Sequence, residues 1–186
     1  MIKLNLKEKR FDDKIVLKHL NITISNGEVL HIVGDSGIGK TTLMRILTGI
    51  DTDFNGVIVN DYKKMSISFP ERVFLGGINL FEEIKVLTNA SDEKINTALF
   101  KLGLSNSKYK YANQLSTGMK SRASVIRAML AKSEIVFLDE PLLGLDENTK
   151  NITKKFITDE LNNRSIVYTG EDIFEKDFLQ NKIFLE

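Results

Sequence analysis

The stretch GDSGIGKTT at residues 34–42 constrains the fold of this chain more than any other feature. It matches the pattern G-x-x-x-x-G-K-[ST] through Gly34, Gly39, Lys40 and Thr41, between a strand-like run, EVLHIV, and a helix-like run, KTTLMRIL. Glycines let the backbone curl so that several N–H groups point inward, and the N-terminus of the helix adds partial positive charge. The stretch therefore predicts a phosphate-binding loop rather than an ordinary glycine turn.

Each polar side chain of this loop has an expected role. The Lys40 ammonium is expected to reach the β- and γ-phosphates of a nucleotide, Thr41 is a candidate Mg²⁺ ligand, and Thr42 offers a hydroxyl to the α-phosphate. The candidate ATP-binding residues of the loop are Gly34, Asp35, Ser36, Gly37, Ile38, Gly39, Lys40, Thr41 and Thr42.

A second element, SEIVFLDEP at residues 133–141, supplies the acidic groups that such a loop needs. Its continuous apolar run predicts a buried strand that ends in Asp139, where a carboxylate can bind Mg²⁺ through water. Glu140 follows directly and is the candidate catalytic residue that orients or deprotonates an attacking water. The alternative is that two acidic residues simply end a strand at the surface. It is less favoured because the chain also contains a phosphate-binding loop.

Length and composition limit the class of protein. The chain has 186 residues, 42% of them hydrophobic, which suits a single domain with a sizeable core. A formal net charge of +1 predicts no nucleic-acid partner, and the absence of cysteine excludes disulfides and thiolate metal sites. No stretch reaches the roughly 18 apolar residues that a membrane-spanning helix needs, and the first residues do not read as a signal peptide.

The order of strand-like and helix-like segments indicates an α/β chain with a helical middle. Short apolar or alternating runs predict strands in residues 2–6, 15–24, 28–34, 55–60, 64–69, 133–141, 165–170 and 182–186. Helical periodicity dominates residues 70–133 and returns in 147–163. Residues 94–133 contain no Asp or Glu, which fits a solvated helical face or a lobe that faces phosphates or a membrane-side partner.

The segment LSTGMKSR at residues 115–122 is a second helix start suited to an anion. Ser116, Thr117 and Gly118 precede a helix-compatible run, with free N–H groups, hydroxyls and no acidic side chain nearby. A single small chain therefore carries two candidate phosphate-binding helix starts.

Taken in order, GDSGIGKTT, LSTGMK, IVFLDEP and GLD at residues 144–146 resemble the ATP-binding cassette (ABC) ATPases along nearly the whole chain. The resemblance implies an α/β fold: a P-loop NTPase core with a mostly parallel sheet, an N-terminal antiparallel β-subdomain and an inserted α-helical subdomain. It further implies one nucleotide-binding domain over residues 1–186, with the core at about 1–69 and 134–186 and the helical subdomain at about 70–133.

The resemblance also explains the second anion site. Cassettes of this family pack head to tail, and the signature of one chain covers the γ-phosphate bound by the other. The signature here is Leu115, Ser116, Thr117, Gly118 and Met119, with Thr117 and Met119 departing from the usual LSGGQ. Asp146 matches the D-loop aspartate at the same interface, and Phe11 stands where an aromatic ring stacks on adenine, unless it is an ordinary edge-strand residue.

Two positions depart from the family pattern. Pro70 or Glu71 stands in the Q-loop where a glutamine is usual, and Gly170 stands in the H-loop where a histidine is usual. We expect His19 and His31, the only two histidines, to be structural. Losing two γ-phosphate sensors predicts slow hydrolysis, because removing one such contact typically costs about 10²–10³ in rate.

These features favour an ATP-binding and ATP-hydrolysing subunit that powers a membrane transporter by ATP-driven dimer closure. The cofactors implied are ATP and Mg²⁺, and the partners are an integral-membrane permease and a second cassette, in a homodimer or a heterodimer. The expected location is cytoplasmic, peripheral on the inner face of the cell membrane. The alternatives are an ATP-gated regulatory switch, the inactive partner of an active cassette and, least favoured, a non-transport cassette that acts on nucleic acid or ribosomes.

Overall fold

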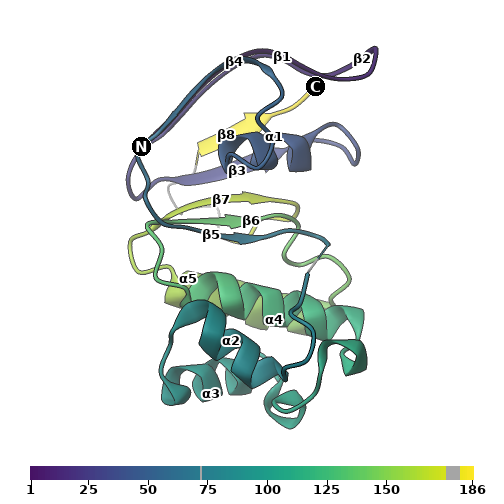
Figure 1. Cartoon of the computed structure of the whole chain (residues 1–186), viewed down its shortest axis with the longest axis vertical. Coiled ribbons are helices and arrows are strands. Elements are labelled where there is room, and N and C mark those ends of the chain that lie inside the picture. The colour runs from purple at the N-terminus through teal and green to yellow at the C-terminus, as the bar shows by residue number, and fades with distance from the viewer. Residues whose placement is uncertain (72, 175–180) are drawn as a thin grey trace.

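The computed structural model describes residues 1–71, 73–174 and 181–186 and has three layers (Figure 1). An antiparallel sheet at the N-terminal end contains β2, β1 and β4 in that order. A parallel sheet forms the centre, in the order β5-β6-β7-β3-β8. Helices α2, α3, α4 and α5 cover its far face. The predicted fold class is confirmed: an antiparallel N-terminal sheet, a parallel central sheet and a group of helices.

The strands have the following bounds: β1 Ile2–Phe11, β2 Lys14–Ile24, β3 Val29–Val33, β4 Asn55–Asn60, β5 Met65–Ser68, β6 Ile135–Leu138, β7 Ser165–Thr169 and β8 Asn181–Phe184. The α-helices are α1 Lys40–Leu47, α2 Leu80–Thr88, α3 Asp92–Lys101, α4 Thr117–Leu130 and α5 Glu147–Glu160. Every strand pair of the central sheet is parallel, so its carboxyl ends meet at one edge.

Alternate residues of the central strands pack into two separate hydrophobic cores. On β7, Val167 faces α1 and the antiparallel sheet, whereas Ile166 and Tyr168 face the helices of the far side. This alternation follows from the two-residue period of a strand, and it explains why β6 and β7 are apolar on both faces. The sheet therefore holds α1 on one side and α4 and α5 on the other.

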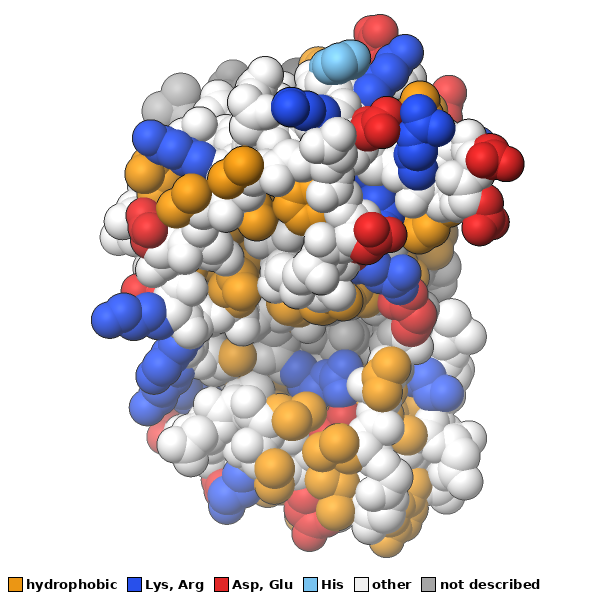
Figure 2. Space-filling model, turned by 45° about the horizontal axis from the view of Figure 1, so that its top comes forward, with side chains coloured by type: hydrophobic (Ala, Val, Ile, Leu, Met, Phe, Trp, Pro, Cys, Tyr) orange, Lys and Arg blue, Asp and Glu red, His pale blue; other side chains and the backbone are white. Residues whose placement is uncertain are grey.

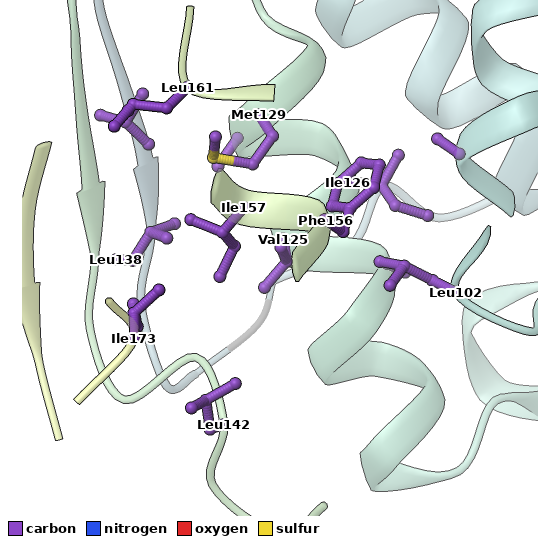
Figure 3. Packing of buried hydrophobic residues seen from close by; sticks show 14 of the residues in the cluster. Leu102, Val125, Ile126, Met129, Leu138, Leu142, Phe156, Ile157, Leu161 and Ile173 are labelled. Atoms are coloured by element: carbon purple, nitrogen blue, oxygen red, sulfur yellow. The ribbon is translucent and has the colours of Figure 1, made fainter. Parts of the chain in front are cut away.

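Packing between α4, α5 and the sheet fixes the position of the helical part. Figure 3 shows Val125, Ile126 and Met129 close to Phe156 and Ile157, with Leu138 on the sheet side. All of these side chains are at most 3% exposed. Burying one Leu, Ile or Phe side chain contributes roughly 1.5–3 kcal/mol, so this layer anchors α4 firmly to the sheet.

Candidate functional site

The loop at residues 34–39 connects β3 to α1 and is shaped by two glycines whose neighbours leave no room for a side chain. Gly39 lies at φ 113°, and a Cβ there would meet Val16 and Leu17 of β2 at 2.9 Å. A Cβ at Gly34 would lie 2.9 Å from Cγ2 of Ile38 and 3.0 Å from the Leu185 carbonyl. The loop is therefore wedged between the β1–β2 hairpin and the end of β8.

Lys40 is the first residue of α1, and its side chain folds back over the loop. Its Nζ donates to the carbonyl oxygens of Gly34 and Asp35, each at 2.8 Å, and the residue is only 9% exposed. The first turn of α1 contains no acidic residue. The ammonium and the free N–H groups of Thr41 and Thr42 thus converge at the helix N-terminus, which is an arrangement suited to an anion.

Asp139 follows β6 at the same edge of the sheet, with β7 between β6 and β3. It is 2% exposed, and its Oδ1 accepts a 2.5 Å hydrogen bond from the Thr169 hydroxyl. Its Oδ2 is buried and has no hydrogen-bond donor among the described residues. Burying a carboxylate oxygen without a partner costs free energy. Oδ2 is therefore suited to coordinate a metal ion or to accept a hydrogen bond from a metal-bound water.

Glu140 has a strained backbone at the next position. Its φ is 46°, a left-handed conformation that costs a non-glycine residue about 1–3 kcal/mol unless its surroundings hold it. The Glu140 N–H donates to the Thr169 hydroxyl oxygen at 2.9 Å. Thr169 therefore contacts both acidic residues and fixes their relative position, a role that the sequence did not reveal because the strands lie far apart along the chain.

The predicted signature helix, α4, is capped by Ser116, whose hydroxyl oxygen accepts a hydrogen bond from the Met119 N–H at 3.3 Å. The Ser116 and Thr117 side chains are exposed, and the first turn has no acid. A Cβ at Gly118 would lie 3.8 Å from the Gly144 carbonyl, and Ser121 donates to the Pro141 carbonyl at 3.0 Å. The first turns of α4 thus pack against the segment that follows Glu140.

Asp146 caps α5 in this structure. Its Oδ1 accepts from the Thr149 N–H at 3.0 Å, and its Oδ2 accepts from the Thr149 hydroxyl at 2.7 Å. These two hydrogen bonds lower the pKa of the Asp146 carboxyl, which is therefore ionised at neutral pH. The family resemblance predicted an interface role for Asp146, whereas its capping role is visible only in the structure.

Phe11 ends β1 and is 51% exposed. The ammonium of Lys9 lies 4.7 Å from its ring centroid and also bonds Oδ1 of Asp51 at 3.0 Å. Phe11 lines a shallow pocket together with Arg45 and Phe69. One face of the ring is thus braced by a cation, while half of the side chain stays accessible to a planar ligand.

The two positions that depart from the family pattern have well-defined surroundings. The Glu71 carboxylate forms an ion pair with Arg45 of α1, and Pro70 stands directly before it. Gly170 follows β7 at φ 90°, and its carbonyl oxygen lies 2.9 Å from Nε2 of His31. Nothing in the sequence indicated that His31 lies near Gly170, the position where the family usually has a histidine. The structure places these two residues in contact.

Arg127 links α4 both to α2, through an ion pair, and to the loop after β5, through a hydrogen bond. Arg127 of α4 bonds the carboxylate of Glu83 in α2, whose side chain is 2% exposed, and donates to the Val73 carbonyl at 2.8 Å. Its guanidinium also lies 4.3 Å from the ring centroid of Phe74. Arg127 thus ties α4 to α2 and to the segment that follows Glu71, and no local sequence pattern indicated either contact.

Comparisons with known proteins point to one family. A family model described as ABC transporter matches residues 17–143. The aliphatic sulfonates import ATP-binding protein of Bacillus licheniformis is 29% identical over 181 residues, which cover 90% of this chain and 71% of that protein. The spermidine/putrescine import ATP-binding protein of Fusobacterium nucleatum is 33% identical over 155 residues, covering 74% of this chain and 41% of that protein.

Solved structures agree on the fold. A protein from Pyrococcus furiosus, described as an ABC transporter ATP-binding protein, has a TM-score of 0.82 at 24% identity, with 99% of this chain and 96% of that chain covered. An ATP-binding cassette solved as a dimer in a post-hydrolysis state with ADP and Pi has a TM-score of 0.78 at 23% identity, covering 93% and 89%. The predicted family is confirmed: this chain belongs to the ABC transporter family of ATP-binding ATPases.

Proposed function

We propose that this chain is the ATP-hydrolysing subunit of a membrane transporter, in which Lys40 binds the terminal phosphates and Glu140 activates water. The observation that carries the proposal is the meeting of a wedged phosphate loop and the Asp139–Glu140 pair at one sheet edge. Adjacent strands lie about 4.8 Å apart, so β3 and β6, with β7 between them, bring these groups within the length of a triphosphate.

Mg²⁺ is part of this proposal because the donors fit it. The Thr41 hydroxyl and the Asp139 carboxylate are oxygen donors of the kind that Mg²⁺ prefers, and Oδ2 of Asp139 is buried without a donor of its own. A bound Mg²⁺ would neutralise the charge that develops on the phosphates. The chain itself holds Asp139 in place through Thr169 and supplies the Lys40 ammonium.

Dimer closure and the membrane partner belong to the same proposal. The exposed signature at Ser116 and Thr117 suits a γ-phosphate bound by a second cassette. Exposed apolar side chains around α2, among them Val73 at 77% and Val86 at 69%, suit a permease (Figure 2 shows hydrophobic side chains on the helical part). The two relatives quoted above are named as import ATP-binding proteins. No helix in the described ranges is long and apolar enough to cross a bilayer.

Slow intrinsic hydrolysis is expected because Gly170 offers no side chain to the γ-phosphate and Glu71 is paired with Arg45. The test is steady-state Mg-ATP turnover of the purified chain, with Glu140→Gln as the blank. Turnover above the blank, yet roughly 10²–10³ below that of a cassette with both sensors, supports the proposal. Turnover equal to the blank over long incubation contradicts it and favours an ATP-gated switch.

A further inference from the structure

His31 is a buried histidine in the middle of β3 that touches the backbone of the neighbouring strand's end. It is 3% exposed, and its ring stacks on Tyr168 of β7 with centroids 4.3 Å apart and planes 11° apart. Its Nε2 lies 2.9 Å from the carbonyl oxygen of Gly170. The stack and the hydrogen bond together leave the ring one orientation.

The surroundings of the ring determine where its proton sits. A carbonyl oxygen only accepts, so Nε2 carries the proton and donates it to Gly170. Nδ1 lies 3.1 Å from Oδ1 of Asp172 but makes no hydrogen bond with acceptable geometry among the described residues, and Asp172 is paired with Lys182 of β8 at 2.9 Å. Burial lowers the pKa of His31, against the opposing effects of Gly170 and Asp172, so the neutral ring with Nε2–H is the form present at neutral pH.

Gly170 lies beside Glu140. A Cβ built on Gly170 would lie 3.5 Å from Cα and 3.7 Å from Cγ of Glu140, at the distance of an ordinary side-chain contact, so the Cα of Gly170 faces that residue. Glu140 has a left-handed backbone and depends on its neighbours to keep it. These neighbours include Thr169, which accepts a hydrogen bond from the Glu140 N–H, Leu143, whose N–H donates to the Glu140 carbonyl oxygen at 3.2 Å, and Gly170.

We propose that His31 is a positioning residue for ATP hydrolysis: it holds the Gly170 carbonyl and thereby fixes the backbone that supports Glu140. This inference rests on the hydrolysis proposed above. Gly170 has no side chain that could contact the nucleotide. His31 is buried and contacts the Gly170 carbonyl oxygen, so it acts on Glu140 indirectly and does not touch the nucleotide. A shift of about 1 Å in a reacting group can cost 10²-fold in rate, so a contact two residues removed from the chemistry is sufficient.

The experiment compares His31→Leu, which removes the donor, with His31→Gln, whose amide nitrogen can reach the position of Nε2. His19→Leu is the matched control, because His19 is the only other histidine and lies exposed on β2. Turnover is measured in all three and in wild type, against Glu140→Gln, with thermal melting to check folding. We expect kcat of His31→Leu to fall about 10- to 100-fold with KM for ATP within about twofold, as for other residues that orient a catalytic group.

We expect His31→Gln to recover most of the lost kcat and His19→Leu to match wild type. The ¹⁵N shifts of the two histidines, assigned with His19→Leu, should show the His31 proton on Nε2 at pH 8. Wild-type kcat in His31→Leu, equal losses in the Leu and Gln variants, or a proton on Nδ1 overturns the inference while leaving the proposed function intact. Wild-type turnover equal to the Glu140→Gln blank overturns the proposed hydrolysis, and this inference with it.

Discussion

The Thr169 hydroxyl donates a 2.5 Å hydrogen bond to Oδ1 of Asp139 and accepts one from the Glu140 N–H. Both acids are therefore positioned by the last residue of β7, the strand between β6 and β3. A hydroxyl is well suited to this place because it is at once donor and acceptor. Thr169 thus links the Asp139 carboxylate to the Glu140 backbone, the two residues that we propose bind Mg²⁺ and activate water.

Replacing Thr169 with Val is expected to destabilise the chain by roughly 1–3 kcal/mol, because Oδ1 of Asp139 and the Glu140 N–H would lose their partner inside the protein. Thr169→Ser keeps the hydroxyl and serves as the matched control. Urea unfolding measures the free energy. A Val variant as stable as the Ser variant would show that this hydrogen bond contributes nothing to the fold.

Arg127→Leu is expected to cost about 3–5 kcal/mol, because the Glu83 carboxylate would remain buried without its partner. Urea unfolding measures the loss, and the double variant with Glu83→Leu should recover part of it. Lys85→Ala, which breaks the exposed pair between Lys85 of α2 and Asp92 of α3, should change stability by less than about 1 kcal/mol. Equal losses of unfolding free energy for the two pairs would show that burial does not make the Arg127–Glu83 pair costly to break.

Stability should fall on acidification partly through His31. Burial lowers the pKa of His31 in the folded chain below its ordinary value near 6.5, so the unfolded chain takes up the proton first as pH drops. The stabilising contribution of the neutral ring is complete above about pH 6.5 and is lost below it. The free energy of unfolding of wild type minus that of His31→Gln should therefore decrease from pH 7.5 to 5.5, and a constant difference would contradict this.

Phe11→Ala is expected to weaken ATP binding by about 1–3 kcal/mol, the usual contribution of a base stacked on an aromatic ring. Phe11→Tyr should bind as wild type does. Calorimetry with Mg-tripolyphosphate, which lacks the base, provides the control and should give the same affinity for all three proteins. If the Ala variant binds ATP as tightly as wild type, Phe11 is an ordinary exposed residue at the end of β1.

Much of the fold and part of the site could be predicted from local sequence. The glycine spacing of residues 34–39 and the acids that end β6 depend on short stretches of backbone, so the pattern alone indicated a phosphate loop and a metal-binding strand end. The order of strands and helices was predictable for the same reason, since hydrophobic periodicity is a local property. The roles of Phe11, the signature and Asp146 remain predictions that rest on resemblance.

The functional groups of this chain can be identified from local sequence: the phosphate loop, the acidic strand end, a second helix start suited to an anion and a glycine where a histidine is usual. Which of these groups lie in contact depends on the tertiary fold. Thr169 reaches Asp139 across 30 residues, Arg127 reaches Glu83 across 44, and His31 reaches Gly170 across 139. These contacts arise from the order and register of parallel strands and from helix packing. Such long-range pairings are fixed by the burial of the whole core, so no local pattern specifies them.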